Sequence, residues 1–276
     1  MRNYKRVVIA GVGLLGGSIG LGLRQRGLAE SLVGWGRNLE KLKVAQSAGA
    51  IDEISDDLAL ACSEADLVVV CTPVQLVPDV AVTASRVAPK ALITDVGSTK
   101  AKIAKQLEEV PNFCGAHPLA GGEKSGSEHA SPDLFCGRTC VITATETTSH
   151  AIQLRTEQFW EGLGAKIIGM SPEQHDSALA MTSHLPHVIA SCLAGVTPSE
   201  LLPLAATGWS DTTRVAAGGV ELWEQIIAQN QQPILKALQQ FQAGLEEWVE
   251  AIEADDQQKL IELLRTGKQI RDSLGN

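Results

Sequence analysis

Short, continuous apolar segments alternate with helical patterns over the first two-thirds of the chain. Segments such as residues 6–10 (RVVIA) and 66–71 (DLVVVC) lack polar alternation, which is typical of strands buried on both faces of a sheet. Helical stretches between them predict an α/β domain with a mostly parallel sheet. The predicted strands are residues 6–10, 32–35, 66–71, 91–95, 113–116, 139–142 and 166–169.

The pattern changes near residue 170, and little strand signal follows. Ser171, Pro172 and Glu173 are typical of a helix start, with a capping residue, a proline at the first position and an acid in the first turn. The sequence therefore predicts an α/β domain over residues 1–170 and a helical domain over residues 171–276. Apolar residues then recur at spacings of three and four, which predicts a long amphipathic helix through Ile234, Leu238, Phe241, Leu245, Trp248 and Ile252.

A glycine motif, GVGLLG at residues 11–16, directly follows the first predicted strand and opens a helix. Gly11 permits a tight turn, Gly13 lets the backbone approach a pyrophosphate, and Gly16 lets helix and strand pack closely. The helix N-terminus would present unpaired N–H groups to the phosphates. The motif therefore predicts a nicotinamide-dependent oxidoreductase whose cofactor loop comprises Gly11, Gly13, Leu14, Leu15 and Gly16.

The end of the second predicted strand indicates which dinucleotide binds. An Asp or Glu at this place would bind the ribose 2′-hydroxyl of NAD. The segment at residues 33–38 reads VGWGRN and holds no carboxylate. Arg37 stands there instead, beside Asn38, and a guanidinium suits a 2′-phosphate. We therefore predict NADP as the cofactor.

Composition narrows the class of protein. The 276 residues carry a net charge of −9, which argues against a nucleic-acid or acidic-membrane surface. The chain enters its first strand directly, without an apolar stretch long enough to span a bilayer, so we expect a cytoplasmic protein. The cysteines fit no zinc pattern, so we expect no metal and reduced, mostly core residues at Cys62, Cys71, Cys114, Cys136, Cys140 and Cys192.

Three further segments stand at the ends of predicted strands, where α/β sheets bind ligands. They are CTPV at residues 71–74, DVGSTK at 95–100 and AHPLAG at 116–121. Taken singly, Ser98 fits a helix cap and His117 fits a hydrogen-bonded core histidine; together they predict a catalytic site. The segments also extend the predicted cofactor site by Thr72, Pro73, Val74, Gly97 and Ser98.

These segments, in this order, resemble the prephenate/arogenate dehydrogenase family of tyrosine biosynthesis. The resemblance includes GVGLLGGSIG at residues 11–20, and SHLPH at 183–187 and DTTRVA at 211–216 in the helical part. It covers nearly the whole chain. It implies a Rossmann-like domain followed by an all-helical dimerisation domain, and hence a homodimer.

The family converts a cyclohexadienol that carries a ring carboxylate into a phenol, with loss of CO₂. This chemistry needs a base for the ring hydroxyl, and His117 fits because imidazole titrates near neutral pH. Ser98 resembles the family serine that orients this histidine and contacts the hydroxyl. Arg214 matches the arginine that binds the ring carboxylate. His187 resembles a contact to the substrate side chain, His184 fits a structural role, and Trp223 fits either that pocket or core packing.

Arogenate and prephenate differ only in carrying an amino-acid or a keto-acid side chain, and no motif here distinguishes them. The predicted NADP preference and short chain resemble the cyanobacterial and plant-type enzymes that prefer arogenate, so we favour arogenate dehydrogenase over prephenate dehydrogenase. Two alternatives stay open. One is another NADP reductase with a helical second domain, such as a pyrroline-carboxylate reductase or β-hydroxyacid dehydrogenase. The other is a non-catalytic NADP sensor, which would not need Ser98, His117 and Arg214 together.

Overall fold

Five parallel strands form the main sheet in a computed structural model that describes residues 3–121, 124 and 126–275. Alternate residues of the central strands enter two separate hydrophobic clusters. Val7 and Ile9 lie in one cluster, and Val8 and Ala10 in the other. The predicted burial on both faces is therefore confirmed. In the order β3-β2-β1-β4-β5, the strands are β3 (Glu53–Ser55), β2 (Ala29–Trp35), β1 (Tyr4–Ala10), β4 (Leu67–Val70) and β5 (Leu92–Asp95).

Helices follow the strands of this region, as the alternating pattern predicts. Gly27 ends the first of them, as expected, because its φ of +61° is accessible to glycine at little cost. Two single turns, η1 (Val74–Leu76) and η2 (Ser127–His129), accompany the helices. The helices are α1 (Leu14–Gln25), α2 (Leu39–Ser47), α3 (Leu58–Cys62), α4 (Val77–Val87), α5 (Ala101–Gln106) and α6 (His150–Gly162).

The last three strands of the α/β region form a sheet of their own, which the sequence did not predict. In this sheet β6 (Gly115–Pro118) pairs antiparallel with β7 (Thr139–Thr143), and β7 pairs parallel with β8 (Lys166–Gly169). The chain just before β6 still touches the main sheet, since Cys114 N donates to Ile93 O of β5 at 3.0 Å. β6 therefore starts beside β5.

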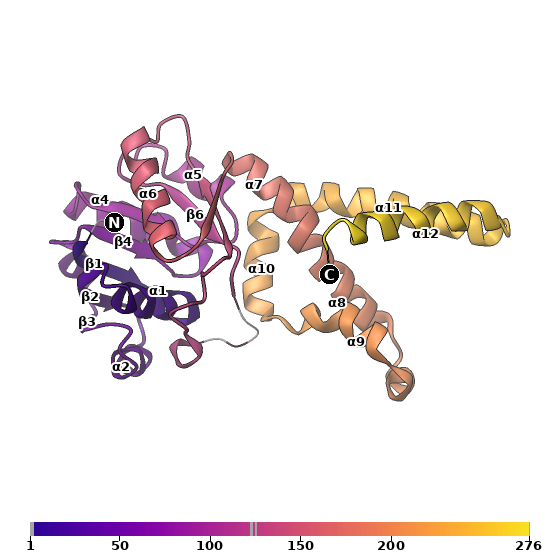
Figure 1. The fold of residues 1–276 in the computed structure, drawn as a ribbon, viewed down its shortest axis with the longest axis horizontal. Coiled ribbons are helices and arrows are strands. Elements are labelled where there is room, and N and C mark those ends of the chain that lie inside the picture. Colours follow the sequence, from indigo (N-terminus) through magenta and orange to yellow (C-terminus); the bar gives the residue numbers. More distant parts are fainter. Residues whose placement is uncertain (1–2, 122–123, 125, 276) are drawn as a thin grey trace.

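Helices follow β8, and the predicted helix start at Ser171 is confirmed, since Ser171 is the N-cap of α7. Ser171 Oγ accepts from Gln174 N at 3.1 Å, and Gln174 Oε1 accepts from Ser171 N at 3.0 Å, which completes a capping box. The elements are α7 (Pro172–Leu179), the π-helical turn η3 (Ala180–His184), α8 (Leu185–Val196), η4 (Ser199–Leu204), α9 (Thr207–Thr213), η5 (Arg214–Ala217), α10 (Val220–Gln229), α11 (Gln231–Glu253) and α12 (Gln257–Asp272). Figure 1 shows this region extending from the α/β region, with α11 and α12 reaching farthest from it.

The predicted apolar stripe lies on α11, but only its beginning is buried. Ile234 is 3% exposed and packs with Ala180 and Leu185. Farther along the helix, Leu245 and Ile252 are 51% and 64% exposed. The far part of α11 therefore presents an apolar face that this chain does not cover.

The expectation that no stretch is apolar and long enough to span a bilayer needs correction. Pro172–Val196, which runs through α7, η3 and α8, is long and apolar enough to cross a membrane by length and composition, with a mean hydropathy of 1.3. About 33% of its most apolar window is buried, and its residues His175, Asp176 and His184 are buried and hydrogen-bonded within the protein, so we interpret it as part of the folded helical region.

The expectation of core cysteines is wrong for two of the six. Cys136 and Cys192 are exposed. Cys136 lies in a surface turn, where an Arg26 guanidinium nitrogen donates to its sulfur at 2.9 Å. Cys192 lies on an exposed part of α8.

Candidate active site

The loop between β1 and α1 has the shape that a bound pyrophosphate requires. Gly11 has a φ of +96°, and a Cβ there would lie 2.7 Å from Cys71 O. A Cβ on Gly16 would lie 2.2 Å from Gly11 O, whereas one on Gly13 would meet nothing within 4 Å. Gly13 is also the N-cap of α1 and offers no side chain to the first turn. Leu14 and Leu15 are the first two residues of that helix, and both are half-buried. The open space before Gly13 and the helix N–H groups fit a dinucleotide phosphate.

The segment after β2 carries the residue predicted to select the cofactor. Arg37 is exposed two positions beyond Trp35, the last residue of β2. Asn38 Oδ1 accepts from Lys41 N at 3.1 Å and so caps α2. Asn38 therefore has a structural role beside the predicted cofactor contact, and the Arg37 side chain is open to a ligand.

The CTPV segment lies against the glycine loop. A Cβ on Gly11 would come within 2.9 Å of Thr72 N, so the two segments meet. Thr72 Oγ1 is buried and has no hydrogen-bond partner among the described residues. Pro73 precedes η1, and Val74 packs in the core beneath it. The Thr72 hydroxyl is therefore a polar group that a bound cofactor would satisfy.

A buried ion pair fixes the strand that carries the predicted base. Lys100 Nζ contacts Asp95 Oδ2 and donates to Ala116 O at 2.8 Å. Asp95 Oδ1 accepts from Ala116 N at 3.1 Å, and Asp95 Oδ2 accepts from Gly97 N at 2.9 Å. Both backbone groups of Ala116 are thus held by the pair. Ser98 lies half-buried in this segment and does not cap α5, whose N-cap is Lys100.

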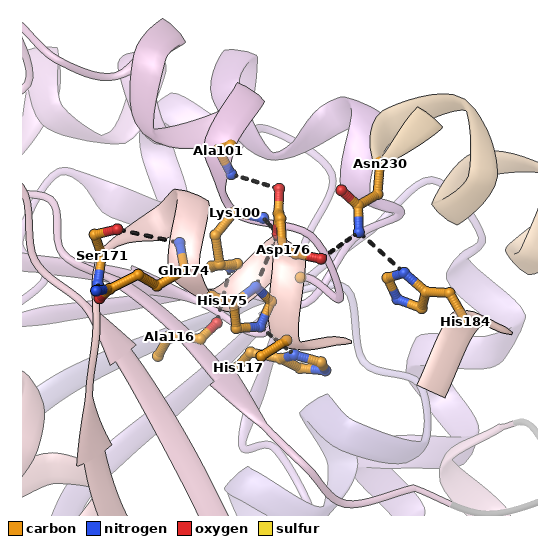
Figure 2. A network of polar contacts seen from close by, with 12 residues as sticks. Lys100, Ala101, Ala116, His117, Ser171, Gln174, His175, Asp176, His184 and Asn230 are labelled. Atoms are coloured by element: carbon orange, nitrogen blue, oxygen red, sulfur yellow. Dashed lines mark hydrogen bonds and ion pairs between the residues drawn. The ribbon is translucent and has the colours of Figure 1, made fainter. Parts of the chain in front are cut away.

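His117 is oriented by the helical region. Its Nδ1 lies 2.8 Å from His175 Nε2, and His175 Nδ1 lies 2.8 Å from Asp176 Oδ1 (Figure 2). The Asp176 carboxylate also accepts from the backbone N–H groups of Lys100 at 2.8 Å and Ala101 at 2.9 Å. The sequence predicted Ser98 as the residue that orients His117; the hydrogen bond to the His117 ring that the structure shows is shared with His175.

Burial keeps His117 and His184 neutral. Burial, the neighbouring His175 and the Lys100 ammonium together hold the pKa of His117 well below the usual 6.5. Burial also lowers the pKa of His184 to about 4, against the opposing effect of the Asp176 carboxylate. A neutral His117 has a free lone pair at neutral pH, which is the state that a general base needs.

The two histidines of SHLPH gather around Trp223 of α10. The His187 ring stacks on the Trp223 ring with centroids 3.5 Å apart and an interplanar angle of 10°, and His184 meets it edge-on at 6.0 Å. His184 Nδ1 lies 3.0 Å from Asn230 Nδ2, which also donates to Asp176 O at 2.7 Å. His187 Nδ1 is buried without a partner among the described residues. His184 is therefore tied into the polar network of Figure 2.

Arg214 begins η5, the turn that packs against α8, and its side chain is exposed. A Cβ on Gly218, just after this turn, would lie 2.5 Å from Trp223 Nε1 and 3.3 Å from His187 Cε1. The segments that carry Arg214, His187 and Trp223 therefore converge in space, as the sequence predicted from motifs far apart in the chain.

Comparison with known proteins assigns the chain to a family. A family sequence model described as "Prephenate dehydrogenase, nucleotide-binding domain" matches residues 19–169. A second, described as "Prephenate dehydrogenase, dimerization domain", matches residues 171–266. The chain belongs to the prephenate dehydrogenase family. It is therefore an oxidoreductase with a domain for a nicotinamide dinucleotide and a helical dimerisation domain.

Three members of the prephenate dehydrogenase family resemble the chain over nearly its full length. Cyclohexadienyl dehydrogenase of Zymomonas mobilis subsp. mobilis is 31% identical over 99% of this chain and 97% of its own. The prephenate dehydrogenase of A. aeolicus, in complex with hydroxyphenyl propionate and NAD+, is 31% identical with a TM-score of 0.92 and covers 98% of both chains. Arogenate dehydrogenase of Synechocystis is 31% identical with a TM-score of 0.82, over 98% of this chain and 99% of its own.

Sequence reasoning about this family member missed four residues of the site: Asp95, Lys100, His175 and Asp176. The first two stood in a segment already singled out, but no pattern shows that a strand-end carboxylate and a lysine five positions later are both buried. His175 and Asp176 follow a recognised helix start. The contact of His175 with His117 spans 58 positions and depends on how the helix docks. The available signal was an adjacent histidine and aspartate just after a capped helix start.

Proposed function

We propose that the chain is an arogenate dehydrogenase that converts L-arogenate to L-tyrosine with NADP. The observation that carries the proposal is His117: a neutral histidine, at the end of β6 beside the cofactor segments, whose Nδ1 is already engaged by His175. Family membership supplies the reaction class. The cofactor and the substrate side chain are inferred from the residues below.

His117 takes the proton of the ring hydroxyl on its free nitrogen. Ser98, at the neighbouring strand end, contacts the same hydroxyl. Arg214 binds the ring carboxylate, which is the group lost as CO₂, and a guanidinium holds a carboxylate in a fixed orientation. His187 and Trp223 line the end of the pocket that takes the substrate side chain. A bound nicotinamide supplies the hydride acceptor, and aromatisation drives the loss of CO₂, so positioning is the main task of the protein.

NADP is proposed on the strength of Arg37. The residue is exposed just after β2, where a carboxylate would select NAD by binding the ribose hydroxyls. In Arg37→Asp, the Kd for NADP should rise at least about tenfold more than the Kd for NAD, because a favourable charge pair becomes a repulsive one. Fluorescence titration with both dinucleotides measures this; an unchanged ratio of the two Kd values would reject the assignment.

Arogenate is favoured by the likeness to the Synechocystis enzyme together with the NADP-type residue at position 37. Prephenate is the second candidate, favoured by the TM-score of 0.92 with the A. aeolicus prephenate dehydrogenase. Steady-state assays with both substrates and saturating NADP decide between them. We expect the larger kcat/KM with arogenate, and turnover of prephenate alone would reject arogenate.

The assembly proposed is a homodimer through the region of residues 171–276, with residues 1–170 binding NADP. The exposed apolar face of α11 supports it, and so does the match to a dimerisation domain. We place the enzyme in the cytoplasm, where NADP and a small precursor of an aromatic amino acid are both available.

A further inference from the structure

Asp176 is held in one position by backbone donors. Its Oδ1 accepts from Lys100 N at 2.8 Å and its Oδ2 from Ala101 N at 2.9 Å. The same Oδ1 lies 2.8 Å from His175 Nδ1. A carboxylate in such a setting only accepts hydrogen bonds, so the proton of this contact resides on His175 Nδ1.

The location of that proton determines the next one. A neutral imidazole carries one proton, so a His175 protonated at Nδ1 has a lone pair at Nε2. His175 Nε2 lies 2.8 Å from His117 Nδ1. His117 must then donate through Nδ1, which leaves the lone pair of His117 on Nε2.

We propose that His175 and Asp176 are positioning residues that hold His117 in the tautomer with a protonated Nδ1 and a free Nε2. The inference rests on the proposed role of His117 as the base. In the opposite tautomer, Nε2 would carry the proton and would be unable to accept another from the substrate hydroxyl.

The relay also stabilises the charge that forms during the reaction. When His117 Nε2 gains the substrate proton, both ring nitrogens carry protons and the ring becomes positive. Nδ1–H then points at the His175 lone pair, and behind it stands the Asp176 carboxylate (Figure 2). The other nearby cation, Lys100, opposes this charge but is paired with Asp95.

The arrangement couples the base to the contact between the two regions of the chain. His117 lies on β6, whereas His175 and Asp176 lie on α7 at the start of the helical region. The Asp176 carboxylate is anchored by the N–H groups that lead into α5, and α5 packs against α7. The base therefore has its working tautomer only when α7 is docked.

Asp176→Asn tests the tautomer directly. An amide that turns its NH₂ toward His175 Nδ1 gives up the hydrogen bond from Lys100 N but keeps the one from Ala101 N on its oxygen. In that orientation it moves the His175 proton to Nε2 and the His117 proton to Nε2 as well. The corresponding change in a Ser-His-Asp triad keeps the geometry and lowers kcat about 10⁴-fold through the wrong tautomer. We expect kcat to fall at least about 100-fold while KM and the Kd for NADP change less than about threefold.

The decisive readout is the ¹⁵N NMR spectrum of the imidazole rings, which distinguishes the two tautomers without needing turnover. The wild-type protein should show His117 protonated at Nδ1, and Asp176→Asn should show it protonated at Nε2. Asp79→Asn, an equal change of charge in the first turn of α4, is the control and should leave both kcat and the His117 tautomer unchanged. An unchanged His117 tautomer in Asp176→Asn overturns the proposal.

A pair of substitutions at His175 gives an independent test that does not depend on Asp176→Asn folding. The glutamine carbonyl in His175→Gln can accept from His117 Nδ1–H, whereas the ring in His175→Phe cannot. We expect His175→Gln to keep at least about ten times the kcat of His175→Phe, as loss of a group that orients a base lowers turnover. Equal kcat values in the two variants would contradict the relay.

A double-mutant cycle separates this proposal from the function on which it rests. If His175 acts through His117, His175→Phe should lower the residual kcat of His117→Asn by less than about threefold, because coupled residues are strongly non-additive. An equal loss in both backgrounds would mean a structural role only. Full turnover in His117→Asn alone would reject His117 as the base, while the NMR spectrum would still report the tautomer.

Discussion

Ala116 and His117 are neighbours on β6 that are held by different means. The buried pair of Lys100 and Asp95 holds the backbone of Ala116, while His175 holds the side chain of His117. A buried ion pair adds little net stability, because the desolvation of two charges offsets their attraction. Here the pair satisfies the backbone N–H and C=O of Ala116, so its main effect is to fix the strand from which the base projects.

The hydrogen bonds that hold Ala116 and His117 could not be predicted from the sequence. The residue types and strand-end positions of Ser98 and His117 predicted a site, because local sequence shows where strands end. Arg214, in the helical region, was predicted only from the resemblance of its segment to a known family. The partners of His117 could not be predicted, because their contacts form between α7 and β6, which are distant in the chain. Periodicity shows which face of a helix is apolar and does not show where that helix docks.

His184 should make the protein sensitive to acid. Its folded-state pKa is about 4, against 6.5 unfolded, so between these values the unfolded chain binds a proton that the folded protein does not. The free energy of unfolding therefore falls as pH drops from 6.5 and levels off near 4, by about 3 kcal/mol from this group.

Urea denaturation at several pH values measures this loss. His184→Asn is the comparison, because its side-chain carbonyl can still accept from Asn230 but cannot titrate. We expect the variant to lose less stability between pH 6.5 and 4.5 than the wild-type protein. Parallel curves for the two proteins would show that His184 is not the group responsible.

At the scale of elements, apolar segments predicted most strands, and capping chemistry predicted the start of α7. The strand β3 (Glu53–Ser55) was missed because three residues with no apolar run leave no pattern. The separate second sheet was missed because strand direction does not appear in local sequence. The direction of β6, antiparallel to β7, depends on the path that the chain takes between β5 and β7.

The capping box of α7 links an element to the site. Ser171→Ala should lower the free energy of unfolding by about 1 kcal/mol, because the first turn loses its side-chain acceptor. It should also lower kcat severalfold, since that turn carries His175. Ser149→Ala removes the cap of α6 and is the matched control: thermal denaturation should show a loss of stability, with kcat unchanged. Equal kcat values in the two variants would show that the capping box of α7 does not affect the site.

At the scale of the whole molecule, the apolar stripe of α11 predicted a long helix but left its partner open. The beginning of the stripe packs against η3 and α8, and farther along Phe241, Leu245 and Ile252 are exposed in the chain taken alone. Exposed apolar faces of this kind are typical of protein interfaces. The family's dimerisation domain coincides with it.

Leu245→Asp should convert the proposed homodimer into monomers, because it places a charge in the middle of that face. Ala243→Asp lies on the opposite side of α11 and should leave the dimer intact. Sedimentation velocity at micromolar concentration distinguishes the two states. A wild-type protein that sediments as a monomer, or a Leu245→Asp protein that remains dimeric, would exclude this face as the interface.

The proposed activity depends on His117 as the base that takes the proton of the ring hydroxyl. His117→Asn removes the imidazole while leaving the glycine loop and Arg37 in place. The initial rate of NADPH formation, measured with arogenate and with prephenate, should fall about 10²- to 10⁴-fold, while the Kd for NADP stays within about threefold of the wild-type value. Turnover of either substrate at the wild-type rate would contradict the account.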